Sequence, residues 1–209
     1  MFEPDGGGVE TGWLPFPMFG PGTEHGVENA IRNAGDTDGT QVFDVWFRPA
    51  AERDEPGRAG TTHLTCAVVP LPFGCPRLEL QPRQPGGDLV GALAADRIEL
   101  ELDGFNERFR IVADDRRFAV AFLDQRMMRS LMGLQPEVSV IVNEDTMLLT
   151  APQLPPGEML LLLEAARVIR HRVPPVVATL YPPRPSKGPH EDRWLQGHWS
   201  PDPIGDEVS

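Results

Sequence analysis

Cysteine, lysine and aromatic residues are all scarce in this sequence of 209 residues. Lys187 is the only lysine, and aromatic residues make up 7% of the chain, so a core must come mainly from aliphatic side chains. The spacing of Cys66 and Cys75 matches neither a zinc signature nor a Cys-x-x-Cys redox motif. We therefore expect two reduced, partly buried thiols, with a disulfide across a loop as the alternative.

Long apolar runs are also missing. No window reaches the roughly 18 uninterrupted apolar residues of a membrane-spanning helix, and Glu164 and Arg167 break the nearest candidate, MLLLLEAARVI. The start, MFEPDGGGVETGW, lacks the basic and then apolar regions of a signal peptide. These absences predict a soluble, cytoplasmic chain.

Positive charge is in deficit. The formal net charge is -12, whereas proteins that bind nucleic acids broadly carry basic stripes that neutralise phosphates. An anionic membrane surface is disfavoured as a partner for the same reason. We expect no nucleic-acid partner.

Recognisable catalytic and ligand-binding motifs are absent as well. The glycine-rich FGPGTEHGVEN has neither the Gly-Lys-Ser/Thr ending of a phosphate-binding loop nor the spacing of a dinucleotide turn. His25, beside Glu24 and Glu28, has no second histidine at helical spacing. We predict no catalytic residue, no cofactor and no metal site, which leans against an enzyme without deciding the question.

Strand periodicity is what the first half does contain. TQVFDVWFR predicts a half-buried strand, paired through a turn at Asp38-Gly39 with a strand around Val27 to Asn33. Further strands are expected in TTHLTCAVVPL and RLEL, and a short helix in LVGALAAD. RIELELDGFNERFRIV predicts a hairpin closed at Asp103-Gly104, although Glu107 would then point inward unless a bulge or wider turn intervenes.

Helical periodicity dominates the second half. Asp114 or Asp115 can cap a helix from Arg116 to Met132, with Asp124 capping a further turn after a kink. EVSVIVNEDTMLLTA predicts two short strands, and a long helix then runs from Pro156 to Arg172, its basic end complementing the helix dipole. We expect the methionines of the first helix to fill the core, and place Phe109, Phe122 and Leu162 there too.

These elements predict an α+β fold with a mostly antiparallel sheet of about six to eight strands, open or closed into a barrel. One central helical segment and a long C-terminal helix pack on that sheet. We expect an N-terminal lead-in at residues 1–25, a single domain at 26–182 and a disordered acidic tail at 183–209.

The pattern also resembles that of a known family. The resemblance rests on FNERFRIVADDRRFAVAFLDQRMMRSLM, read with HLTCAVVPLPFGCPRLEL, GVENAIRN and VFDVWF, and spans Gly26 to Val173. It is to a bacterial family of unknown function with an F-N-x-x-F-x-V core, whose members often follow a membrane-spanning region or occur near LemA-like membrane proteins. The resemblance implies a cytosolic domain close to a membrane, although this sequence has no spanning segment, and it brings no catalytic or binding residues.

Three functions fit these observations. The favoured one is a noncatalytic interaction or regulatory module that binds a protein partner. A sheet edge, the helix end near Arg170, or the tail residues Trp194, Leu195 and Trp199 would form its binding surface. The alternatives are a small-molecule or lipid-headgroup binding module and an enzyme of unknown class.

The cysteine pair gives a first test. We predict that Cys66 and Cys75 are reduced and hold no zinc, so thiol titration after denaturation without reductant should count both. Metal content would be measured on the same sample. Fewer than two titratable thiols would indicate a disulfide instead.

Overall fold

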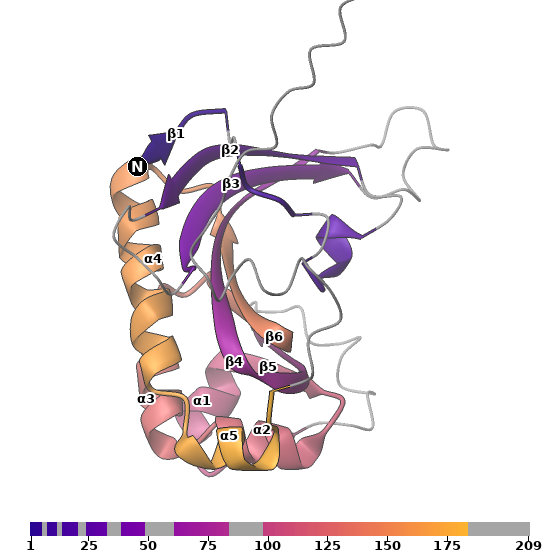
Figure 1. Cartoon of the computed structure of the whole chain (residues 1–209). Coiled ribbons are helices and arrows are strands. Elements are labelled where there is room, and N and C mark those ends of the chain that lie inside the picture. The colour runs from indigo at the N-terminus through magenta and orange to yellow at the C-terminus, as the bar shows by residue number, and fades with distance from the viewer. Residues whose placement is uncertain are drawn as a thin grey trace, which may run out of the picture.

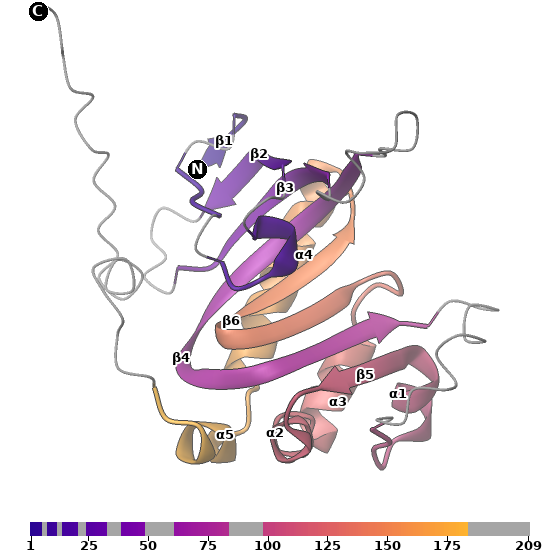
Figure 2. The same ribbon diagram turned by 90° about the vertical axis from the view of Figure 1, so that its right-hand side faces the viewer.

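The chain folds into a bent antiparallel sheet with its α-helices on one side (Figures 1 and 2). The computed structural model describes residues 1–5, 8–11, 14–20, 24–32, 39–48, 61–83 and 98–183. Six strands form the sheet within these ranges: β1 (Phe2–Glu3), β2 (Glu24–Arg32), β3 (Gln41–Arg48), β4 (Thr62–Pro82), β5 (Phe109–Ala113) and β6 (Ser139–Pro152). The predicted α+β class and antiparallel sheet are confirmed.

β4 is the strand to which most others attach. Its first half pairs with β3 on one side and with the second half of β6 on the other. Beyond a change of register between Pro70 and Cys75, its second half pairs with β5 and with the first half of β6. Figure 2 shows β4 and β6 turning together at this point. Each is one bent strand, so the two separate strands predicted in each segment are wrong.

The predicted pairing of the first two long strands is confirmed, because β2 pairs antiparallel with β3. The expectation that β3 is only half-buried is wrong. Phe43 and Val45 face a small core formed with Leu14, Phe16 and Phe19 of the N-terminal segment. Val42 and Asp44 are buried as well, on the face that α4 covers.

The N-terminal segment is therefore an integral part of the fold. It includes the short 3-10 helix η1 (Pro17–Phe19), which lies across the sheet from α4 in both views. β1 extends the sheet by pairing with β2. Residues expected to be a lead-in thus cover one face of the sheet.

Five α-helices are described: α1 (Asp103–Arg108), α2 (Arg116–Phe122), α3 (Gln125–Met132), α4 (Pro156–His171) and α5 (Pro175–Leu180). The predicted hairpin closed at Asp103-Gly104 is wrong, because these residues begin α1. Phe105 of α1 and Phe109, the first residue of β5, are both buried and pack together, with ring centroids 5.0 Å apart. Glu107, the residue that did not suit the hairpin, is exposed.

The central helical segment consists of two helices, α2 and α3, which are separated at Asp124, where the sequence predicted a kink. Asp115 caps α2 by accepting from the amides of Arg117 and Phe118, and Asp124 caps α3 by accepting from that of Met127. The methionines of α3 fill the core as predicted, with Met127 0% and Met128 2% exposed. LVGALAAD lies outside the described residues.

The last described residues are tied to the rest of the domain. The Tyr181 hydroxyl donates to Asp115 Oδ2 at 2.7 Å, and its ring meets that of Phe118 edge to face. The amide of Gly74, in the bend of β4, donates to the carbonyl of Pro182 at 3.3 Å. The last described residues are therefore fixed beside α2.

The main core lies between the sheet and the helices. Phe109, Phe122 and Leu162 belong to it, as predicted, and Cys75 is buried in it, while Cys66 lies in the smaller core across the sheet. None of the described helices is long and apolar enough to cross a bilayer.

Truncating Phe122 to alanine should destabilise the protein by about 3 to 5 kcal/mol, because the ring is fully buried and would leave a cavity. Val120→Ala is the matched control on the same helix. Its side chain is 54% exposed, so its effect should stay within about 0.5 kcal/mol. Denaturant unfolding measures both, and equal effects would contradict the placement of Phe122.

Candidate functional site

Of the four predicted partner-binding residues, the structure places one. Trp194, Leu195 and Trp199 lie outside the described residues. Arg170 lies in the last turn of α4, where its side chain is half-buried and interacts within the protein. Any partner-binding surface at this end of α4 must therefore involve neighbouring side chains that are more exposed.

The residues of the FNERF motif make folding contacts. Asn106 accepts from the amide of Leu100 at 3.0 Å and donates to its carbonyl at 2.7 Å, which replaces a strand pairing. Arg108 donates to the carbonyl of Met132, the last residue of α3, and to those of Leu134 and Gln135 beyond it, and burial lowers the pKa of its guanidinium. The motif that carries the family resemblance is thus a structural one.

The candidate metal residues also have structural roles. His25 Nε2 lies 2.8 Å from the hydroxyl of Thr11, and the ring packs edge-on against Phe19. Over the described ranges, no group of three histidine, cysteine, aspartate or glutamate side chains is placed to hold a metal ion.

A buried carboxylate, Asp44, lies beneath α4. It accepts from the side chains of Asn29 and Thr65, and the Thr65 hydroxyl accepts in turn from the amide of Leu154 just before α4. Asn29 reaches it from a bulge in β2, where its φ is 52°.

The Cys66 thiol is not activated. Burial, helped by the charge of Asp44, raises its pKa. This disfavours the thiolate that a cysteine nucleophile needs.

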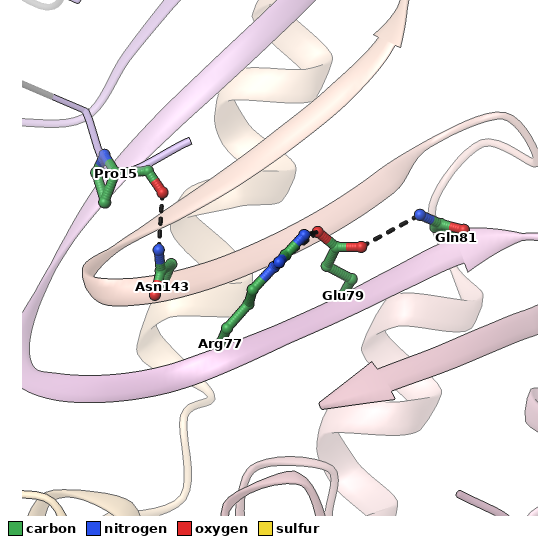
Figure 3. A network of polar contacts seen from close by, with 5 residues as sticks. All are labelled: Pro15, Arg77, Glu79, Gln81 and Asn143. Atoms are coloured by element: carbon green, nitrogen blue, oxygen red, sulfur yellow. Dashed lines mark hydrogen bonds and ion pairs between the residues drawn. The ribbon is translucent and has the colours of Figure 1, made fainter. Parts of the chain in front are cut away.

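A polar network lines β4 beyond its bend, on the face turned away from the helices (Figure 3). Arg77 donates to Glu79 through Nε at 3.0 Å and through Nη2, and Gln81 donates to the other carboxylate oxygen. The bond to Glu79 raises the pKa of Arg77. Nearby, Asn143 Nδ2 donates to the carbonyl of Pro15 at 2.7 Å. Glu79 is 8% exposed and paired with Arg77, so we assign the bonds among the β4 side chains to stabilising that strand, and the bond from Asn143 to holding the N-terminal segment on β6.

Helix α4 presents a largely apolar outer face, which we define by Leu160, Leu161 and Val168. These side chains are 50%, 65% and 47% exposed, respectively. The exposed Glu164 lies between them on the helix. The inner face buries Met159, Leu162, Leu163, Ala166 and Ile169. The sequence signal was the run of four leucines at 160–163, because successive residues on a helix turn by about 100° and cannot all face one core.

The helices at the foot of Figure 1 carry a second feature, which we call the basic end. Its members are the exposed residues Arg116, Arg117, Arg126, Arg129, His171 and Arg172. Asp124 is the only acidic residue in positions 116–134, and positions 165–183 contain none. From the sequence, only the basic cluster at the end of α4 was predicted, both as a complement to the helix dipole and, near Arg170, as one possible binding surface.

Contacts between helices hold the basic end in place. Arg172 Nη1 donates to the Ser130 hydroxyl at 2.6 Å, which joins the end of α4 to α3. The pair of Tyr181 and Asp115 joins the end of α5 to α2. These two bonds fix α3 against the end of α4 and α2 against the end of α5.

The pair of Asp115 and Tyr181 predicts losses of stability at both extremes of pH. Burial and the bond to Asp115 raise the pKa of Tyr181 from its ordinary value of 10.0 to about 12. Tyr181 therefore stabilises the fold fully below pH 10, and this stabilisation is lost as the pH rises to about 12. The bonds to Tyr181 and to the helix amides lower the pKa of Asp115 below its ordinary value of 3.8. Asp115 therefore stabilises the fold fully above pH 3.8, and this stabilisation is lost as the pH falls through the pKa of Asp115 in the folded protein.

Tyr181 is the only tyrosine, so its titration can be followed by tyrosinate absorbance without assignment. In Tyr181→Phe, the unfolding midpoint should lose part of its alkaline dependence and part of its acid dependence, while the Cys66 thiol, whose pKa is also raised, still contributes at high pH. If Tyr181 titrates in the folded protein near pH 10, as it does in the unfolded chain, the hydrogen bond to Asp115 is contradicted.

Comparison with known proteins adds no relative. No protein-family model, no curated protein and no solved structure matches the chain. The resemblance to the bacterial family of unknown function therefore stays a prediction.

Proposed function

We propose that this chain is a noncatalytic interaction module that binds a protein partner through the apolar outer face of α4. The exposure of Leu160 and Leu161 carries the proposal. Adjacent apolar side chains on one face mark interaction sites more often than single exposed ones do. Burying them would contribute about 25 cal/mol for each Å² of apolar surface removed from water.

The scaffold suits such a role. The inner face of α4 is packed on β3 and β4, so the outer face is held rigid before any partner arrives. The polar clusters described above are engaged in structural bonds, which favours recognition over chemistry. A cytoplasmic location, proximity to a membrane and a contribution from Trp194, Leu195 and Trp199 remain parts of the proposal that rest on sequence alone.

Site-specific photo-crosslinking in the native cells tests this function. A photoreactive residue in place of Leu161 should give a discrete crosslinked protein. The control replaces Val112, which is 38% exposed on β5 and faces away from the helices. Leu160→Asp should weaken the partner complex by about 2 kcal/mol, or about 30-fold in Kd, as loss of a central apolar contact does.

Two results would contradict the proposal. One is the absence of a crosslinked protein at position 161. The other is the same product from positions 161 and 112, which would indicate random encounter.

A further inference from the structure

The basic end is an exception to the charge of the whole chain. The net charge is -12, yet this end combines five exposed arginines and a histidine with few carboxylates. Elsewhere, Arg32, Arg48 and Arg77 each form a salt bridge with a glutamate. No salt bridge to a described carboxylate is found for Arg126, Arg129 or Arg172.

Helix dipoles explain only part of this arrangement. Arg129, His171 and Arg172 lie at the C-terminal ends of α3 and α4, where positive charge is favourable. Arg116 and Arg117 begin α2, and Arg126 lies in the first turn of α3, where the dipole disfavours positive charge. Each such placement costs about 0.3 to 1 kcal/mol at an exposed site, offset in part by the capping aspartates. Arg117 is offset by its attraction to the ionised Asp115, whereas the helix dipoles give no reason for Arg116 and Arg126.

The surface among the arginines is partly apolar. Val120 of α2 is 54% exposed, and Val168 of α4 and Val176 of α5 are each 47% exposed. Val168 also belongs to the apolar outer face of α4, so the two features are continuous. Arginine favours carboxylates as partners, because its planar guanidinium can donate two parallel hydrogen bonds to one carboxylate.

We propose that the basic end is the docking site for an acidic segment of a protein partner, one in which carboxylates are interspersed with apolar side chains. The proposal rests on the proposed function and names the chemistry of the partner. Charges separated by more than about 8 to 10 Å are largely screened in physiological salt. A short acidic segment can therefore contact the arginines alone, whereas a membrane plane or a long nucleic acid also approaches the acidic remainder of the chain.

An amide-resolved NMR titration of the full chain tests the proposal. The probe is a short synthetic peptide rich in glutamate and valine, with a matched peptide that has glutamine for each glutamate. Phosphatidylglycerol vesicles and duplex DNA are the other probes. The acidic peptide should shift the amides of α2, α3 and the last turn of α4, and binding should weaken as salt is added.

Charge reversal supplies the controls. Arg126→Glu with Arg129→Glu should raise the Kd of the acidic peptide by about tenfold or more, because two charge pairs become repulsive. Arg126→Gln with Arg129→Gln removes the charges without adding repulsion and should have a smaller effect of the same sign. Arg110→Glu changes an exposed arginine on the face of β5 turned away from the helices, and should leave the Kd unchanged.

Several outcomes would overturn the inference. These are no shifts at the basic end, equal binding of the glutamine peptide, an equal effect of Arg110→Glu, or tighter binding of vesicles or DNA at the same amides. If the peptide fails while position 161 still crosslinks a protein, the interaction function stands and only the acidic partner is rejected. If the peptide binds but position 161 crosslinks nothing, the proposed use of the outer face of α4 is the part that fails.

Discussion

The shared bend of β4 and β6 is the constraint on which the rest of the structure depends. β4 pairs with β3 through its first half and with β5 through its second half, on the edge opposite β6. β6 must bend at the matching place, and Glu144, paired with Cys75, has a φ of 53° there. The bend gives the sheet two halves at an angle. It lets α4 cover the upper half while α1, α2 and α3 close the lower half (Figure 1).

Local patterns predicted the elements whose boundaries depend on near neighbours. The alternation in β3, the caps at Asp115 and Asp124 and the burial of Phe122 all follow from residues close in sequence. The hairpin before β5 failed for a non-local reason. Alternating side chains fit a strand there, but the Asn106 side chain bonds to the backbone of Leu100, and Phe105 of α1 packs on Phe109 at the start of β5. Likewise, nothing local shows that β4 runs unbroken through Pro70 and Pro76.

The candidate surfaces were predictable to a smaller extent. A helix ending near Arg170 was foreseen as an interaction site, but Arg170 is half-buried, and the exposed charge lies on residues of α2 and α3 as well. Only the packing of α3 beside α4 and of α5 beside α2 shows that these arginines share one end. The outer leucines of α4 could have been found from helical period alone, because the run of leucines is wider than one buried face.

The anchoring of Pro182 and Tyr181 has a consequence for avidity. Because the Gly74 amide and Asp115 hold these two residues, whatever follows Pro183 starts from a fixed origin close to the basic end. Suppose that a ligand bound both the segment after Pro183 and α4. Once the first of these contacts had formed, the second would form within the same complex. The effective concentration of that contact is set by the length of chain between them and reaches the millimolar range for short linkers. Two weak contacts can in this way give one selective complex, and loosening the anchor would lower the affinity without touching either contact.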